Sequence, residues 1–218
     1  MIKITLSLNN GVDRMLKIAV LVSGRGTNLK AIIKNIKNGD IAASIDIVIS
    51  DQKDALALDK AAQQGIENTF IDPDAYATVE EYEKSLIHLL DEKNIQLVVL
   101  AGFMRILSPY FINYYKNRIM NIHPSLLPSF RGLNAQEQAL NYGVKITGCT
   151  VHFVDTGMDT GPIILQKAVE VRDDDTVERL SQRILNEEHK IYSKAIKLFS
   201  EGKLIIKGRN VNIIKEGE

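Results

Sequence analysis

The segment KIAVLVSGRGTN, residues 17–28, joins a continuous apolar run to a turn that contains two glycines. An apolar run of this length is typical of a strand buried on both faces, as in a parallel sheet. A helical pattern follows at about 28–38, and a second apolar run lies at about 45–50. This order predicts two parallel strands joined by a right-handed crossover helix.

The same alternation of apolar runs and helical patterns continues along the chain. It predicts an α/β fold with a doubly wound, mostly parallel sheet that is covered on both faces. The strand-like runs of the last third are expected to be antiparallel. The later strands are predicted near 67–71, 97–101, 118–122, 145–154 and 162–171, and the later helices near 54–64, 78–92, 134–142 and 175–199, with a short helix beginning at Ser108.

The two ends of the chain have patterns of their own. Apolar residues alternate over positions 2–8, as in a half-exposed strand, and Met15 directly precedes the first strong pattern, so either Met1 or Met15 is the expected start. The tail LIIKGRNVNII (204–214) has Gly and Asn between two apolar runs, which predicts a hairpin. We therefore expect an N-terminal extension over 1–15, one domain over 16–201 and a C-terminal tail over 202–218.

Composition excludes several classes of function. The chain has 27 Lys and Arg residues and 27 Asp and Glu residues. Its net charge is therefore zero, and no overall electrostatic field favours a nucleic acid or an anionic membrane as partner. No apolar run approaches the roughly 20 residues of a membrane span, and the N-terminus lacks the pattern of a secretory signal, so we expect a cytoplasmic protein. The single cysteine, Cys149, excludes an internal disulfide.

The GRGTN turn (24–28) is a candidate anion site. A turn between a buried strand and a helix aims backbone N–H groups and the positive helix end at whatever lies above the sheet. The turn lacks the third glycine of a dinucleotide motif and the Gly-Lys-Ser/Thr of a nucleotide loop, which favours a single phosphate group. The alternative is an ordinary turn with Thr27 or Asn28 as the helix cap.

Asn121 and His123 end a predicted strand, and Pro124 follows them directly. Period-two geometry places both side chains on one face, with Ile122 on the other. An amide donor beside an imidazole, at the carboxyl end of a parallel sheet, suits a reaction that generates an oxyanion and moves a proton. The alternative is that both side chains only bond a neighbouring loop.

Asp155 and Asp159 lie in the glycine-bearing loop DTGMDTGP (155–162) between two strands. One of them is expected to lie near His123, where a carboxylate favours the protonated imidazole. Asp beside Gly more often bonds its own backbone in a turn. We interpret Asp155 as such a turn residue, and the choice for Asp159 stays open on the residues alone.

The remaining candidates lie in the second half of the chain. Glu188 interrupts an apolar helical stripe, so it is expected to reach a polar cleft or, as the alternative, to extend to solvent at the edge of the stripe. His88 and His189 are interpreted as helix-surface residues. Cys149, His152 and Asp155 have the wrong spacing for metal ligands on one strand, so no metal site is predicted.

Four runs resemble the phosphoribosylglycinamide formyltransferase family: AVLVSGRGTNL (19–29), VVLAGFMRILSP (98–109), NIHPSLLPSFRG (121–132) and GCTVHFVDTGMDTGPIILQ (148–166). The resemblance extends from Leu16 to about Phe199. Each run alone is degenerate, but their order and spacing together are specific. The resemblance implies formyl transfer from 10-formyltetrahydrofolate, as co-substrate, to the amine of phosphoribosylglycinamide in purine synthesis, without a metal or a tightly bound cofactor, by a monomer or a homodimer.

The resemblance also implies roles for individual residues. Asn121 and His123 would stabilise the developing oxyanion, Asp159 would hold the imidazole, and Glu188 would contact the ribose or the glycinamide end of the substrate. The residues implied to bind the substrate phosphate are Gly26, Thr27, Asn28, Leu29 and Lys30, and those implied to line the folate pocket are Met104, Arg105, Ile106 and Leu107, with Asn121 beside them.

Two positions depart from the family pattern. Asn134 stands where a histidine often follows Gly-Leu, and Val79 stands where some members place an arginine that contacts the folate. Neither contact is carried over to this chain. Neither position changes Asn121, His123 or Asp159.

Other functions remain compatible with parts of the pattern. Methionyl-tRNA formyltransferase and formyltetrahydrofolate hydrolase would use the same Asn-x-His and distant Asp, but they would be expected to carry a further RNA-binding or regulatory domain. A non-catalytic protein that binds a sugar phosphate would use the glycine turn alone.

Overall fold

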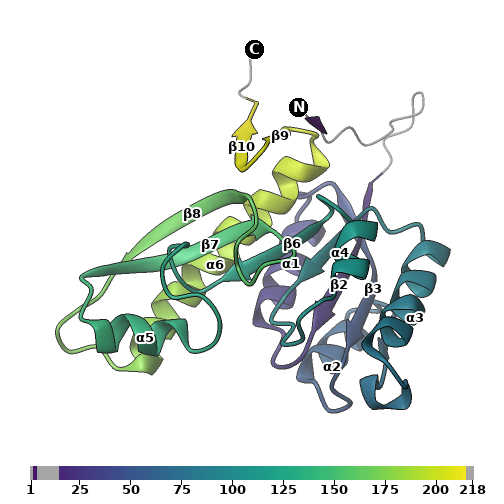
Figure 1. Cartoon of the computed structure of the whole chain (residues 1–218), viewed down its shortest axis with the longest axis horizontal. Coiled ribbons are helices and arrows are strands. Elements are labelled where there is room, and N and C mark those ends of the chain that lie inside the picture. Colours follow the sequence, from purple (N-terminus) through teal and green to yellow (C-terminus); the bar gives the residue numbers. More distant parts are fainter. Residues whose placement is uncertain (1, 4–14, 215–218) are drawn as a thin grey trace.

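The computed structural model of the chain describes residues 2–3 and 15–214, which form a ten-stranded sheet with helices on both faces (Figure 1). The strand order is β1-β9-β10-β8-β7-β6-β5-β2-β3-β4. The parallel strands are β2 (Leu16–Val22), β3 (Ala43–Ser50), β4 (Asn68–Phe70), β5 (Leu97–Leu100) and β6 (Ile119–His123). The α/β, doubly wound and mostly parallel fold predicted from the sequence is confirmed.

Most pairings between the strands of the last third are antiparallel, as expected. Strand β7 (Ile146–Phe153) pairs antiparallel with β6 and with β8 (Ile163–Glu170). The predicted hairpin consists of β9 (Leu204–Lys207) and β10 (Asn210–Ile213). At the N-terminus, β1 (Ile2–Lys3) pairs with β9, whereas residue 1 and residues 4–14 of the predicted extension lie outside the described residues.

Alternate side chains of the central strand β2 enter two separate cores, which explains its continuous apolar sequence. Ile18, Val20 and Val22 pack on one face, and Ala19 and Leu21 pack on the other. The first face is covered by α1 (Thr27–Lys37), α2 (Leu56–Ala62) and α6 (Val177–Ser200), and the second by α3 (Val79–Glu92) and α4 (Pro109–Tyr114). Helix α5 (Ala135–Tyr142) packs against α6.

Side-chain caps fix where several helices begin. The Ser108 hydroxyl accepts the Tyr110 N–H at 3.2 Å, with Pro109 at the first helical position of α4. The Thr78 hydroxyl accepts the Glu81 N–H at 3.2 Å at the start of α3. Boundaries differ from the predicted ones by a residue or two, as expected where helix and strand ends fray.

Among the described residues, no helix combines the length and the apolar character that crossing a membrane requires.

Candidate active site

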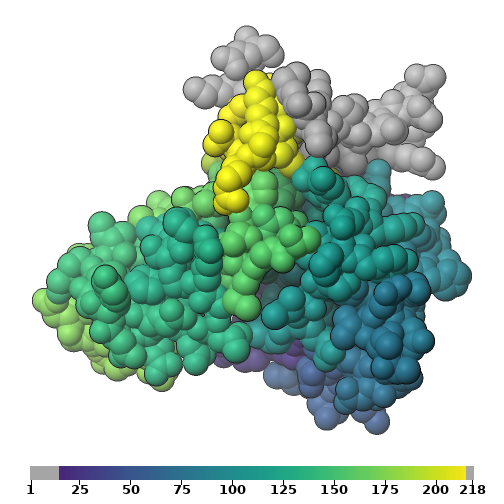
Figure 2. Space-filling model, in the orientation of Figure 1, coloured from purple at the N-terminus to yellow at the C-terminus, as the bar shows by residue number. Residues whose placement is uncertain are grey.

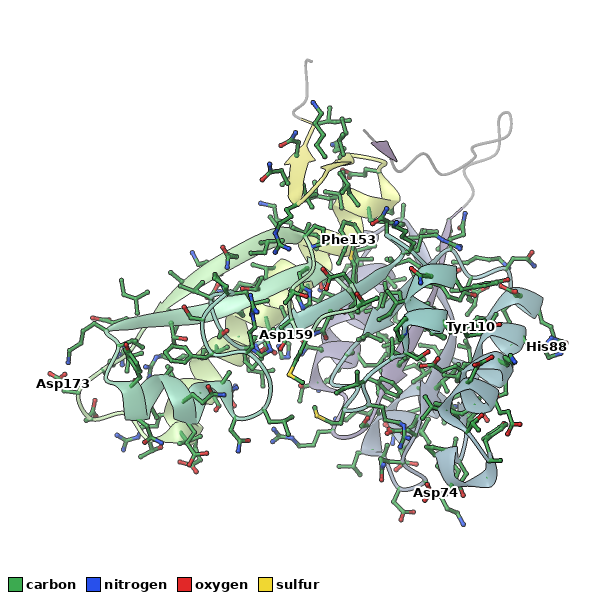
Figure 3. The ribbon with its side chains drawn as sticks, in the orientation of Figure 1. Asp74, His88, Tyr110, Phe153, Asp159 and Asp173 are labelled. Carbon is green, nitrogen blue, oxygen red and sulfur yellow. The ribbon has the colours of Figure 1, made fainter. Side chains whose placement is uncertain are left out.

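Asn121 and His123 lie at the carboxyl end of β6, and Ile122 between them packs into the core on the opposite face, as period-two geometry predicted. The His123 side chain is almost fully buried, whereas Asn121 is partly exposed. In the space-filling view, a hollow separates the green lobe formed by later segments from the blue-green lobe of the parallel strands (Figure 2). Asp159 lies between the two lobes (Figure 3).

The two ring nitrogens of His123 face two different acceptors. Nδ1 lies 3.3 Å from Asp159 Oδ2, and Nε2 lies 2.8 Å from the Phe130 carbonyl oxygen. A carbonyl and a carboxylate accept hydrogen bonds, so an imidazolium with a proton on each nitrogen satisfies both contacts. The positive ring is then compensated by a carboxylate of which only 12% is exposed.

The loop after β7 positions Asp159 and uses Asp155 differently. Asp159 has a positive φ of 51°, and its Oδ2 also accepts the Gly132 N–H at 2.9 Å. The Asp155 carboxylate accepts the Gly157 N–H at 3.2 Å and the Thr160 hydroxyl at 2.5 Å, which confirms that it is a turn residue. Of the two carboxylates, Asp159 is therefore the one paired with His123.

His152 completes the cluster, and the sequence interpretation missed this placement. The β6–β7 pairing sets His152 directly opposite Asn121, with Asn121 Nδ2 3.3 Å from His152 Nε2. His152 Nδ1 lies 2.9 Å from the Phe153 carbonyl and so carries the proton, which leaves Nε2 to accept from the amide. Burial lowers the pKa of His152, in keeping with this neutral ring. The contact orients the Asn121 amide, and its second N–H has no partner among the residues that the structure describes.

The glycine turn leaves the start of α1 without a side-chain cap. Gly26 is the N-cap residue with a φ of 65°, and neither Thr27 nor Asn28 caps the helix, so the ordinary-turn alternative lacks the cap that it requires. The first N–H groups of an α-helix have no intrahelical partners. The uncapped turn therefore presents donors and a positive helix end to an anion.

Asn28 and Glu188 join α1 to α6 through buried polar groups. Asn28 Nδ2 donates to Glu188 Oε2 at 3.0 Å, and both side chains are more than nine-tenths buried. The alternative that Glu188 extends to solvent is wrong. Asn28 Oδ1 has no hydrogen-bond partner within the described part of the chain, so this oxygen can accept a hydrogen bond from a ligand beside the glycine turn.

Comparison with known proteins gives the family. The formyl transferase family model matches residues 16–196. The chain belongs to the formyl transferase family. It is 43% identical over 189 residues to phosphoribosylglycinamide formyltransferase of Escherichia coli, which covers 87% of this chain and 89% of the relative.

Two further relatives show how much of each protein's length matches this chain. The human trifunctional purine biosynthetic protein adenosine-3 is 48% identical over 186 residues, and the matched part covers 85% of this chain but 18% of that protein. The crystal structure of glycinamide ribonucleotide transformylase 1 from Symbiobacterium toebii has a TM-score of 0.92 and 49% identity, covering 96% of this chain and all of that one. The match thus spans 14–18% of the length of the trifunctional relatives and most of the length of the bacterial ones.

The segment after β5 in this formyl transferase offers an exposed apolar surface. Met104 is 65% exposed and Ile106 is 76% exposed, whereas Leu107 is buried in the core and presents little surface to a ligand. The Arg105 guanidinium lies 5.6 Å from the centre of the Tyr82 ring. Exposed apolar side chains at a strand end suit a flat aromatic ligand.

The two histidines predicted to lie on helix surfaces differ in their exposure. His88 is exposed and pairs with Glu92 at 3.4 Å, as predicted. The surface interpretation of His189 is wrong, because its side chain is partly buried and its Nε2 atom has no partner among residues 15–214. In the same described residues, no three His, Cys, Asp or Glu side chains form a set that could hold a metal ion. Asn134, at the departure from the family pattern, precedes α5 with a φ of 56°.

Replacing Glu188 by glutamine is expected to raise stability at neutral pH. Burial raises the pKa of Glu188, an effect that the Asn28 bond partly offsets. The native state therefore holds the proton more tightly than the unfolded chain, and the free energy of unfolding falls as pH rises from about 4.3 through the raised pKa. Thermal melts of Glu188→Gln at pH 7.5 should gain roughly 2–4 °C, and this gain should vanish near pH 4.

Glu187→Gln provides the matched control for this experiment. Glu187 is the preceding residue and its carboxylate pairs with Lys190 at 2.7 Å near the surface. This variant should show no gain in melting temperature, because a surface ion pair contributes little to stability. A Glu188→Gln protein that melts below the wild type at pH 7.5 contradicts the expected cost of the buried charge.

Proposed function

We propose that the chain transfers the formyl group of 10-formyltetrahydrofolate to the amine of phosphoribosylglycinamide, giving formylglycinamide ribonucleotide and tetrahydrofolate. The observation that carries the proposal is the His123–Asp159 pair, 3.3 Å apart, beside the oriented Asn121 amide. The amine attacks the formyl carbon and negative charge develops on the formyl oxygen. The second Asn121 N–H and the His123 imidazolium stabilise that charge.

Proton movement completes the exchange. The tetrahedral intermediate collapses with cleavage of the bond from the formyl carbon to the folate nitrogen, and the proton lost by the attacking amine ends on that nitrogen. His123 Nε2 is bonded to the Phe130 carbonyl in this structure, so the formyl oxygen replaces that carbonyl as its acceptor. Asp159, 3.3 Å from Nδ1, holds the ring in place and compensates its positive charge.

The arrangement of the sheet suits a substrate with a phosphate at one end and an amine at the other. The glycine turn follows β2 and His123 ends β6, and β5 lies between these two strands. Two strand spacings separate the two groups by about 10 Å along the sheet. The turn residues Gly26 to Lys30 would hold the phosphate, Glu188 would contact the ribose or the glycinamide end, and the surface from Met104 to Leu107 would hold the folate.

The proposed reaction needs neither a metal nor a tightly bound cofactor, because the charge that develops is met by the protein's own donors. Both substrates are small molecules, and the proposal includes no nucleic-acid or membrane partner. We place the reaction in the cytoplasm.

The proposal is tested by mixing the purified chain with both substrates and following loss of the formyl donor spectroscopically. We expect loss of donor that depends on the ribonucleotide acceptor. A parallel reaction without acceptor measures simple deformylation. Donor loss that is independent of the acceptor would support a hydrolase instead, and the absence of any donor loss would leave a sugar-phosphate binder.

A further inference from the structure

A second cavity, of about 790 Å³, follows the solvent-facing side of α1 between α2 and α6. Helix α1 contributes residues at helical spacing from Thr27 to Asn38, and it packs against both neighbouring helices. The cavity is within the size range of ligand pockets in proteins. It meets the proposed phosphate site only at its Thr27 and Lys30 end. We call this cavity the lysine groove.

The charge of the lysine groove departs strongly from the neutral balance of the whole chain. No Asp or Glu is among its lining residues, whereas the lining includes Lys30, Lys34, Lys37, Lys60 and Lys190. Positive charges that line a concave site raise the local concentration of anions.

The partners of these lysines leave much of the positive charge uncompensated. Lys190 pairs with Glu187 at 2.7 Å, while Lys37 donates to the neutral Gln64 side chain at 2.6 Å and Lys60 donates to the Arg25 carbonyl. The side chains of Lys30 and Lys34 make no hydrogen bond or ion pair with any other residue in the described range 15–214. Within the described part of the chain, four of the five lysines that line the groove therefore have no carboxylate partner.

His189 adds an unsatisfied polar atom to the same groove. Its Nε2 is buried and lacks a partner within the described residues, although its ring belongs to the groove lining. Burial lowers the pKa of His189, so the ring is neutral near pH 7 and offers a hydrogen bond without adding charge. A buried polar atom of this kind generally finds a partner, and an incoming ligand would provide one.

We propose that the lysine groove binds an extended polyphosphate, such as the triphosphate chain of a nucleotide. Lys30 and Lys37 are separated by seven residues, or about 10 Å along the helix axis, so an extended anion reaches more of this row of lysines than a single phosphate does. Lysine ammonium groups serve as point charges for phosphate, and the positive end of α1 lies at the Thr27 end of the groove. The groove shares Thr27 and Lys30 with the substrate phosphate site, so the polyphosphate competes with the ribonucleotide. This effect on catalysis rests on the proposed function.

Calorimetric titration of the full chain with inorganic tripolyphosphate tests the site directly. We expect one saturable site per chain, and the Lys34→Gln/Lys37→Gln double variant should bind about tenfold more weakly or worse. The matched control is Lys84→Gln/Lys145→Gln, which removes two exposed lysines that are ion-paired on other surfaces of the molecule. Its affinity should stay within about twofold of the wild type.

Three outcomes of the titrations overturn the proposal. The first is no saturable binding of tripolyphosphate, and the second is an equal loss of affinity in both double variants, which would indicate general surface charge. Orthophosphate should bind about tenfold more weakly than tripolyphosphate, because it reaches fewer lysines. Equal affinity for the two anions would reject an extended ligand.

Kinetics separate failure of this proposal from failure of the proposed function. Tripolyphosphate should raise the apparent KM for the ribonucleotide without changing kcat, and the groove variant should need about tenfold more of it for the same effect. Without tripolyphosphate, the groove variant should turn over like the wild type. If tripolyphosphate binds as expected but the chain does not transfer the formyl group, the proposed function is rejected and the polyphosphate site is retained. If formyl transfer is normal but tripolyphosphate does not inhibit it, competition between the polyphosphate and the ribonucleotide is rejected.

Discussion

Replacing Asp159 by asparagine is expected to lower kcat for formyl transfer by about 10²- to 10⁴-fold. Asparagine has nearly the same shape and retains an oxygen for the Gly132 N–H, which Asp159 Oδ2 accepts at 2.9 Å. The variant removes the negative charge 3.3 Å from His123 Nδ1, so the imidazolium that donates to the formyl oxygen loses its compensating partner. Steady-state kinetics and a thermal melt of the same protein measure the loss.

Asp155→Asn is the matched control, because it makes the same change four positions earlier in the same loop. The Asp155 carboxylate bonds Gly157 and Thr160 within the turn and makes no hydrogen bond or ion pair with the His123 side chain. We expect kcat within about threefold of the wild type and a stability loss of about 1 kcal/mol. Comparable losses of kcat in both variants would mean that the loop fold, rather than the Asp159 charge, limits the rate.

A double variant distinguishes a shared role from two independent ones. His123→Ala alone is expected to lose about as much kcat as Asp159→Asn, because it removes the donor that the carboxylate supports. Residues that act as a unit are strongly non-additive, so the His123→Ala/Asp159→Asn protein should be little slower than either single variant. Additive losses would assign Asp159 a role apart from the imidazole.

The parallel core and the position of His123 could be predicted because local sequence controls both. An apolar run that ends at a proline or a glycine turn marks a strand end, and the ends of parallel strands meet at one edge of the sheet. This logic placed Gly26 and His123 on the same edge. The same logic left the role of Asp159 undecided. The 155–162 loop lies near His123 only because β7 pairs with β6, and these two strands are far apart in the sequence.

His152 and Glu83 show what the sequence pattern could not provide. His152 meets Asn121 only through the register of the antiparallel β6–β7 pair, and register depends on pairing that a single strand does not encode. Glu83 occupies a helix position in α3 and is almost fully buried, because it accepts the Ser108 N–H at 2.6 Å from another segment. A polar group can be buried when the tertiary structure provides its hydrogen-bond partner. Helical spacing alone does not reveal that partner and predicts an apolar core residue at the position of Glu83.

Replacing Gly26 by alanine is expected to cost about 3 kcal/mol of the free energy of unfolding, the sum of left-handed strain and overpacking. Gly26 has a φ of 65°, and an added Cβ would lie 2.7 Å from Ala57 Cβ and 2.9 Å from Ala57 Cα. Ala57 has little freedom to retreat, because it is fully buried and its N–H donates to the Gly24 carbonyl at 3.1 Å. The melting temperature should fall by roughly 10 °C, and the displaced turn should raise KM for the ribonucleotide.

Gly65→Ala separates the two causes of that loss. Gly65 has a similar φ of 69°, but an added Cβ would meet no atom within 4 Å. This variant therefore carries the strain of the left-handed backbone alone and should cost about 1 kcal/mol, with KM unchanged. The difference in unfolding free energy between the two variants measures how tightly α2 is packed against the glycine turn. Equal losses would show that Ala57 moves aside readily, and the turn would then be held by its own backbone rather than by contact with α2.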